Sequence, residues 1–162
     1  MSLVHVILGL LQQQERTGYD LKTKCFDDCI AHLWPADQAQ IYRTLDKLES
    51  QAWITCTVEI QHDRPNRKVY RITETGEAEL TQWLQTHHPL PVLREPLLAQ
   101  LYFAAQLPNE EIVYLLEQEL EARQEKLAQC EAIEALFLSN PTASCEQKLH
   151  RLVLDLVKQR EQ

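Results

Sequence analysis

The sequence predicts a mainly α-helical protein with a small β-hairpin: a winged helix-turn-helix domain over residues 1–87, then a C-terminal helical dimerisation domain over residues 88–162. Three observations support this prediction. Three short helical patterns precede two strand patterns and a fourth helix in the first half of the chain. A proline-containing segment without periodicity, His87 to Pro91, follows them. The second half of the chain then shows helical periodicity only.

The first two elements are predicted to be short helices joined by a tight break. Residues 2–14 carry leucine, isoleucine and valine at spacings that bury a wide helical face. The Arg16-Thr17-Gly18 segment ends this helix. Thr17 can cap a second helix over about residues 18–30, because Asp20 stands three positions later. The inner stripe of the second helix is expected to be Leu21, Cys25 and Cys29.

A third helix, running to about residue 50, is predicted to have one apolar and one polar face. Asp37 and Gln40 repeat the capping signature at its start. Ile41, Leu45 and Leu48 lie within one narrow arc of this helix, which we expect to be buried. Two short helices with a break between them, the second polar on its outer face, are typical of a helix-turn-helix.

Two strands and a fourth helix complete the first domain. Residues 54–61 alternate strictly between apolar and polar side chains, which predicts a half-buried strand. His62 to Asn66 has the composition of a turn, and Arg67 to Thr73 returns as the second strand of a hairpin. A hairpin in this position is a wing. The fourth helix begins between Thr73 and Gly76 and is expected to bury Leu80, Trp83 and Leu84.

Basic and amide side chains gather on the third helix and the hairpin. Lysine and arginine there can reach phosphates on both DNA strands, while glutamine and arginine near the start of the helix can read base edges. We therefore expect double-stranded DNA as a partner, with two copies of the chain bound about 34–36 Å apart on a pseudo-palindrome. The residues expected to bind DNA are Gln38, Gln40, Arg43, Lys47, Arg64, Arg67, Lys68 and Arg71.

The second domain is expected to form a homodimer. Helical patterns cover residues 97–105 and 109–138, and a last helix follows Pro141. About 70 residues cannot bury three apolar helical faces alone, and a second copy is the simplest partner. The residues expected at the interface are Leu116, Leu120, Leu127, Leu149, Leu152, Val153 and Leu156. Tyr102, Phe103 and Tyr114 are candidates to line a cleft for a small-molecule effector, the alternative being that they pack in the helical core.

Composition excludes several classes of function. The 3 glycines lie far apart, which excludes a glycine-rich phosphate loop or dinucleotide fingerprint. No carboxylate pair, Ser/His or Cys/His arrangement has supporting context, so we expect neither an enzyme nor a cofactor. The apolar run Val6 to Leu11 is too short to span a membrane. The 5 cysteines have no disulfide-framework spacing, which indicates reduced thiols and a cytoplasmic location.

Two features favour other interpretations. The net charge of −8 is unfavourable for DNA, and both halves of the chain are acidic. An alternative is therefore a protein-interaction module, in which the winged helix is a scaffold and the long helix over 109–138 docks a partner. Cys25, Cys29 and His32 share one helical face and could hold a metal ion. Because Leu21 lies on the same face, buried thiols explain the pattern more simply, and no metal site is predicted.

Five short motifs resemble, in order, those of the PadR family of winged-helix transcriptional regulators. The resemblance covers residues 3 to about 84. It implies a cytoplasmic repressor that is dimeric through its C-terminal helices and often responds to a small-molecule or stress signal. The motifs are Leu8-Gly9-Leu10-Leu11, Thr17-Gly18-Tyr19-Asp20-Leu21, Ile41-Tyr42-Arg43-Thr44-Leu45-Asp46-Lys47-Leu48-Glu49, Lys68-Val69-Tyr70-Arg71-Ile72-Thr73 and Thr75-Gly76.

The resemblance also implies roles for individual residues. Tyr19 would support the first two helices, Tyr42 and Arg43 would belong to the DNA-recognition helix, and Lys68 to Arg71 would belong to the wing. The chain departs from the family pattern just after the recognition helix. Members usually carry glycine there, whereas this chain has Gln51-Ala52-Trp53. A residue other than glycine in a left-handed cap costs about 1 kcal/mol, which makes the angle between helix and wing less certain.

Overall fold

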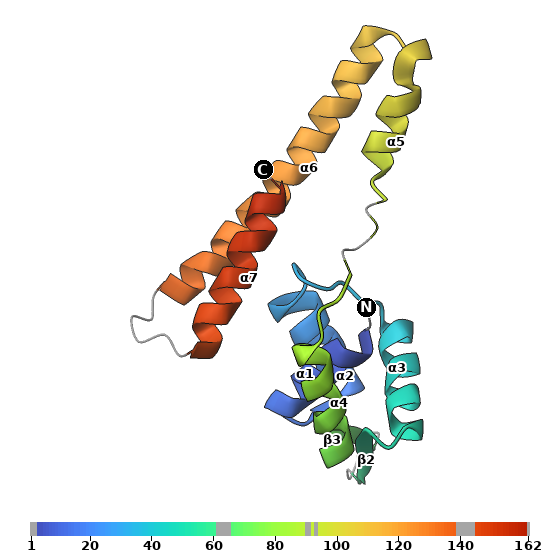
Figure 1. Cartoon of the computed structure of the whole chain (residues 1–162), viewed down its shortest axis with the longest axis vertical. Helices are drawn as coiled ribbons and strands as arrows, with labels where there is room; N and C mark the ends of the chain where they lie inside the picture. Colours follow the sequence, from blue (N-terminus) through green and yellow to red (C-terminus); the bar gives the residue numbers. More distant parts are fainter. Residues whose placement is uncertain (1–2, 61–65, 90–91, 93, 139–144, 162) are drawn as a thin grey trace. The chain divides into compact units, whose positions relative to one another are not determined.

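A three-stranded antiparallel sheet and the helices around it form the first of two units, Met1–Leu90 and Pro91–Gln162 (Figure 1). The computed structural model describes residues 3–60, 66–89, 92, 94–138 and 145–161. The order of elements confirms the predicted winged helix-turn-helix. It is α1 (Leu3–Gln13), β1 (Arg16–Thr17), α2 (Gly18–Asp20), the π-helix η1 (Leu21–Cys29), α3 (Gln38–Ser50), β2 (Ile54–Glu59), β3 (Arg67–Ile72) and α4 (Glu74–Gln85).

Helix α1 supplies the centre of the core of the first unit, in contact with α3, α4 and β3. Ile7 and Leu8 are fully buried. The predicted apolar arc of α3 is fully buried as well, and three tryptophans, Trp34, Trp53 and Trp83, pack at the edge of the core. The prediction for α4 was wrong at one position. Leu84 is 67% exposed, because α4 turns only the face that carries Leu80 toward the core.

The sheet has the strand order β1-β3-β2, so the predicted hairpin gains a third, two-residue strand. Ile54 pairs with Ile72 and Glu59 with Arg67 across the hairpin. On the other edge of β3, Arg16 pairs with Tyr70. The sequence predicted a break at Arg16-Thr17-Gly18. The cap residue Thr17 has an extended backbone, and together with Arg16 it pairs with the open edge of β3.

The second helix begins at the predicted place, but most of it is a π-helix and not an α-helix. Thr17 caps it, with the Asp20 amide donating to the threonine Oγ1 at 3.0 Å. From Leu21 onward the helix is a π-helix, and the Ile30 amide donates to the Cys25 carbonyl five residues earlier at 2.9 Å. The wider turn moves the buried stripe to Leu21, Cys25 and Phe26. Cys29, predicted to be on the inner stripe, is therefore exposed.

A left-handed residue closes the corner between α3 and the wing. The Trp53 amide donates to the Leu48 carbonyl and the Ala52 amide to the Glu49 carbonyl, both at 3.0 Å. These two bonds define a Schellman motif, and Ala52 has φ 57°. The chain thus adopts the turn that glycine usually makes, with alanine in its place.

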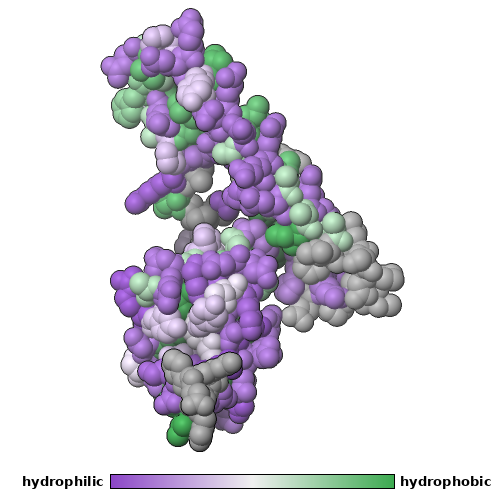
Figure 2. Space-filling model, turned by 180° about the vertical axis from the view of Figure 1, so that it is seen from behind, coloured by the Kyte–Doolittle hydropathy of each residue, from purple (hydrophilic) through white to green (hydrophobic). Residues whose placement is uncertain are grey.

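The second unit is helical, as predicted. It contains α5 (Pro96–Phe103), the 3₁₀ turn η2 (Ala104–Gln106), α6 (Asn109–Leu138) and α7 (Cys145–Glu161). Helices α6 and α7 pack together around the buried Cys130 and Leu154, and the Lys158 Nζ reaches the Glu134 Oε2 at 2.7 Å. Hydrophobic side chains interrupt the hydrophilic surface of α5 and α6 in Figure 2. None of the helices in the described ranges has a stretch long and apolar enough to cross a bilayer.

The residues predicted to form a dimer interface lie largely at the surface of this unit. Leu154, which the sequence prediction did not include, fills the contact between α6 and α7 instead. Leu127 and Val153 are half-buried. The exposed members of the predicted set are Leu116, Leu120, Leu149, Leu152 and Leu156, each 43% to 57% exposed.

Candidate nucleic-acid interface

Helix α3 presents exposed polar side chains to solvent around its buried apolar arc, with Arg43 on the opposite side from that arc. Gln38, Gln40, Arg43 and Lys47 are exposed on this helix. The Gln40 amide N–H donates to the Asp37 Oδ1 at 2.7 Å, and the Asp37 amide donates to the Gln40 Oε1 at 3.2 Å. This capping box occupies the side-chain oxygen of Gln40 and leaves its NH₂ group available. The bidentate contact with adenine that the sequence suggested for Gln40 would therefore require the box to open.

Arg43 and Lys47 stand one turn apart on the same face. The Arg43 Nε donates to the Ala39 carbonyl at 3.2 Å, which fixes the stem of the side chain and leaves the outer guanidinium nitrogens exposed. Within the described parts of the chain, neither Arg43 nor Lys47 takes part in an ion pair of 4.0 Å or less. Both positive charges are thus available to a ligand.

Tyr42 has a different position from the other predicted DNA contacts. It is 37% exposed, and its ring lies against Gly18 in the second helix. A Cβ atom at Gly18 would stand 2.7 Å from the tyrosine Cε1 and Cζ, so only glycine fits without a shift of the ring. Tyr42 therefore packs α3 against α2. Tyr19, in contrast, is 67% exposed.

The wing carries three of the predicted cations among its described residues, and Arg64 lies outside those residues. The Arg71 Nε and Nη2 both donate to the Glu15 Oε2, at 3.1 and 2.7 Å. The Arg67 Nη2 donates to the Asp20 Oδ2 at 3.2 Å. Lys68 is exposed and makes no ion pair within the described ranges. Among the described wing residues, Lys68 therefore carries an unneutralised charge, while Arg67 and Arg71 are each bonded to an acid.

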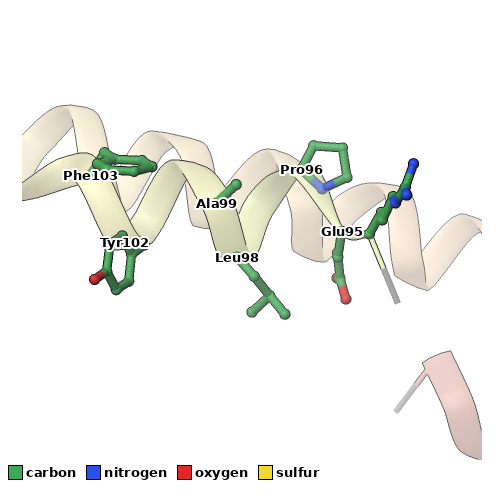
Figure 3. Close-up of a pocket in the computed structure, with 7 residues that line it drawn as sticks. Glu95, Pro96, Leu98, Ala99, Tyr102 and Phe103 are labelled. Carbon is green, nitrogen blue, oxygen red and sulfur yellow. The ribbon is translucent and has the colours of Figure 1, made fainter. Parts of the chain in front are cut away.

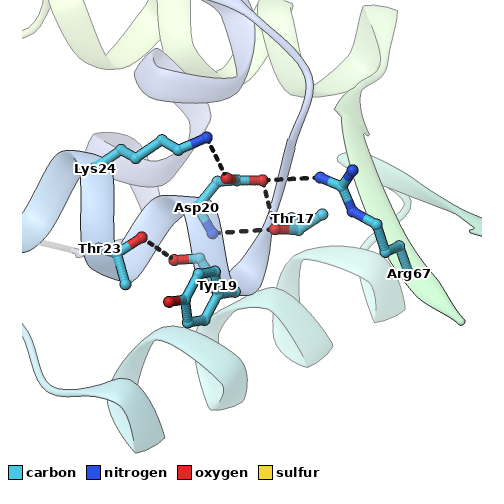
Figure 4. Close-up of polar contacts among 6 residues, drawn as sticks. All are labelled: Thr17, Tyr19, Asp20, Thr23, Lys24 and Arg67. Atoms are coloured by element: carbon cyan, nitrogen blue, oxygen red, sulfur yellow. Dashed lines mark hydrogen bonds and ion pairs between the residues drawn. The ribbon is translucent and has the colours of Figure 1, made fainter. Parts of the chain in front are cut away.

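Asp20 is a functional candidate that the sequence reasoning assigned only to helix capping (Figure 4). Its Oδ1 accepts from the Lys24 Nζ at 2.7 Å, and its Oδ2 accepts from the Thr17 hydroxyl at 2.6 Å as well as from Arg67. The hydrogen bonds from Lys24 and Thr17 lower the pKa of Asp20 from 3.8 to about 2. The contact with Arg67 spans 47 positions, so no local spacing could have revealed it.

The aromatic residues predicted to line one effector cleft are divided between two hollows on the second unit. Tyr102 and Phe103 form an edge-to-face pair with ring centroids 5.0 Å apart. They border an open hollow of about 630 Å³ along α5, together with Leu98, Ala99 and the Arg94-Glu95-Pro96 segment (Figure 3). Tyr114 borders a second hollow of about 540 Å³, to which Phe103 also contributes.

The cysteine segment of the second helix has no metal-binding geometry in the described ranges, where no group of three His, Cys, Asp or Glu residues could hold an ion. Cys25 is buried, and burial raises the pKa of its thiol to about 11. A protonated, buried thiol is a poor nucleophile and a poor metal ligand. Cys25 is therefore a core residue.

Comparison with known family models covers both units. The model described as "Transcriptional regulator PadR-like family" matches residues 7–82. The model described as "Virulence activator alpha C-term" matches residues 93–162. The first match ends within α4 and the second begins just before α5, so residues 83–92 lie between them.

Individual relatives include the negative transcriptional regulator PadR of Bacillus subtilis, which is 35% identical over 127 residues, 78% of this chain and 69% of that protein. A probable transcriptional regulator of Mycobacterium tuberculosis is 44% identical over 84 residues, 52% of this chain and 44% of that protein.

Solved structures resemble nearly the whole chain. The crystal structure of B. subtilis PadR in complex with operator DNA has a TM-score of 0.84 and 34% identity, covering 98% of this chain and 90% of that one. The B. subtilis PadR complex with p-coumaric acid has a TM-score of 0.80, 30% identity and coverage of 98% and 89%. The Vibrio cholerae virulence activator AphA has a TM-score of 0.77, 31% identity and coverage of 99% and 89%.

Proposed function

The chain belongs to the PadR-like family of transcriptional regulators, and from that premise we propose that it is a homodimeric repressor that binds a pseudo-palindromic operator. The observation that carries the proposal is the division of α3 into two faces. Its apolar arc is fully buried, whereas Arg43 and Lys47 are exposed on the other side of the helix and Gln38 is exposed in its first turn. A helix anchored in this way can enter the major groove with its reading side chains outward.

In this proposal α3 reads sequence and the wing binds the backbone. Arg43 can form a bidentate contact with guanine, and Gln38 at the start of the helix can contact adenine. Lys47 and Lys68, which are not neutralised by acids within the described ranges, would contact phosphates. The B. subtilis relative solved with operator DNA has the same fold over nearly the whole chain, which supports this mode of binding.

The dimer would form through the second unit. The exposed leucines of α6 and α7 make an apolar surface that a single copy leaves in water. Each of these side chains is about half exposed, so covering it contributes roughly half of the ~1.5–3 kcal/mol of full burial, and the leucines of both copies together can offset the cost of association. A two-fold arrangement uses the same surface on both copies and spaces two recognition helices for two half-sites.

A small-molecule effector is the proposed signal. The hollow along α5 offers exposed aromatic and apolar side chains, chiefly Leu98, Tyr102 and Phe103, beside the charged Arg94 and Glu95. This mixture suits a small aromatic molecule that carries a polar group. A solved complex of B. subtilis PadR with p-coumaric acid supports this class of ligand.

The decisive experiment selects genomic fragments bound by the full chain and then measures retardation of the selected fragment at two salt concentrations. Arg43→Ala should abolish specific retardation and leave the dimer intact in sedimentation. Lys148→Ala, which removes one positive charge from the exposed surface of α7, is the matched control and should bind normally.

The exposed Val113, Leu116 and Leu120 on α6 favour a second candidate, a module that docks a partner protein on the long helix. The same experiment distinguishes the two. An intact protein that retards no fragment even at low salt would contradict the regulator and favour the docking module.

A further inference from the structure

We propose that Asp20 is a positioning residue for DNA binding, which orients the Arg67 guanidinium at the start of β3, toward the tip of the wing, so that its remaining N–H groups meet a DNA phosphate. This inference rests on the function proposed above. It concerns a residue on the first helix of the helix-turn-helix, which belongs neither to the recognition helix nor to the wing.

The carboxylate of Asp20 is held firmly enough to orient a partner. It accepts from the Thr17 hydroxyl at 2.6 Å and from the Lys24 ammonium at 2.7 Å, and the amide of Asp20 itself donates to Thr17 at 3.0 Å (Figure 4). Its side chain is 14% exposed. A carboxylate with this many bonds has little rotational freedom, so it holds a guanidinium bonded to it in one orientation.

The contact with Asp20 orients Arg67 and leaves most of its N–H donors available. Only the Nη2 of Arg67 donates to Asp20, at 3.2 Å, and 48% of the arginine side chain is exposed. A guanidinium has five N–H donors, so most of them stay available for a phosphate. The pair Arg71–Glu15 differs, because the Nε and Nη2 of Arg71 both bond to one carboxylate oxygen, and the Glu15 side chain is itself 50% exposed.

The Asp20–Arg67 contact also extends the connection between the wing and the helix-turn-helix. Backbone pairing joins β1 to β3 only at Arg16–Tyr70 and Thr17–Val69. Arg67 is two residues nearer the wing tip than that pairing reaches. The segment that begins at Gly18 is in turn packed against Tyr42 of the recognition helix. Asp20 thus fixes the start of β3, toward the wing tip, relative to the helices that would lie in the groove.

The test measures the affinity of the full chain for its selected operator by fluorescence anisotropy over a series of salt concentrations. Asp20→Asn keeps an oxygen for Thr17 but removes the charge, and should weaken binding by roughly threefold to tenfold. Arg67→Gln should weaken binding to a similar extent and lower the salt slope by about one unit. The double variant should bind no more weakly than Arg67→Gln alone, because each change removes the same contact.

Glu15→Gln is the matched control, since it removes one negative charge beside the other arginine of the wing. It should change affinity by less than about twofold. Equal weakening in the control would mean that loss of either acid–arginine pair of the wing has the same effect, and would overturn the specific role of Asp20. Wild-type or tighter binding by Asp20→Asn, or additive effects in the double variant, would also overturn it.

If Asp20→Asn does not fold, Arg67→Lys carries the test, because lysine keeps the charge and loses the planar fork. The inference then requires weaker binding with an unchanged salt slope, and wild-type affinity contradicts it. Failure of the wild-type chain to bind any fragment would refute the proposed function together with this inference, whereas operator binding that is insensitive to Asp20 refutes the inference alone.

Discussion

Replacing Ala52 with glycine should stabilise the first unit by about 0.5–1 kcal/mol. Ala52 has φ 57°, a conformation in which the Cβ of an ordinary residue crowds the backbone at a cost of about 1–2 kcal/mol. Glycine removes this strain. Its more flexible unfolded state costs about 0.5–1 kcal/mol of stability, which leaves the net gain stated above. The Ala52 carbonyl accepts from the hydroxyls of Thr73 and Thr75 at 2.8 and 2.9 Å, and these bonds do not involve the substituted side chain.

The measurement is urea unfolding followed by tryptophan fluorescence, for which the neighbouring Trp53 is a reporter. Ala78→Gly is the matched control, because Ala78 is exposed in α4 and has ordinary helical geometry. The same chemical change should there destabilise the protein by about 0.5–1 kcal/mol. If both glycine variants lose stability alike, the left-handed strain at Ala52 does not exist and the reasoning is refuted.

Three further predictions follow from other contacts. Gly76→Ala should cost more than about 2 kcal/mol in urea unfolding, because its Cβ would stand 2.1 Å from the Trp53 carbonyl oxygen, whereas Gly9→Ala, with nothing within 4 Å, should cost nothing. The pKa of Asp20 is lowered to about 2, so its ionised carboxylate should stabilise the fold fully above pH 3.8, and this stabilisation should be lost as the pH falls toward 2. The measurement is the difference in unfolding free energy between wild type and Asp20→Asn, and a difference that does not change over this pH range would contradict the prediction. Leu120→Glu should give monomers in sedimentation and weak operator binding, and a stable dimer would argue against this interface.

Periodicity and capping rules were sufficient to predict most of the fold, because they act over a few residues. The apolar arc of α3 and its capping box follow directly from the positions of Ile41, Leu45, Asp37 and Gln40. The π-helix was missed, because its sequence has the same polar composition as an α-helix and the extra residue per turn depends on packing. The exposed Cys29 is the direct consequence.

The residues that contact DNA could be proposed from residue type. Which of these side chains are already bonded to other groups of the protein could not be predicted in this way. Sequence placed Arg67 and Arg71 on one strand, yet their acidic partners come from 47 and 56 positions away. Likewise, Gln40 fits both a cap and a base contact by sequence, and only the structure shows that its oxygen is occupied. Long-range pairing decides which charges remain available, and no local pattern contains that information.

The acidic character of the chain is compatible with DNA binding because of where its acids are bonded. Two of them, Glu15 and Asp20, are bonded to wing arginines, while Arg43, Lys47 and Lys68 have no acid within ion-pair distance in the described ranges. Three cations among the proposed contact residues therefore remain available to phosphates in spite of a net charge of −8. The rest of the surface repels phosphates, so random sequences gain little from electrostatics alone. Correct base contacts must then contribute a larger share of the affinity, which favours selectivity for an operator over tight binding to any duplex.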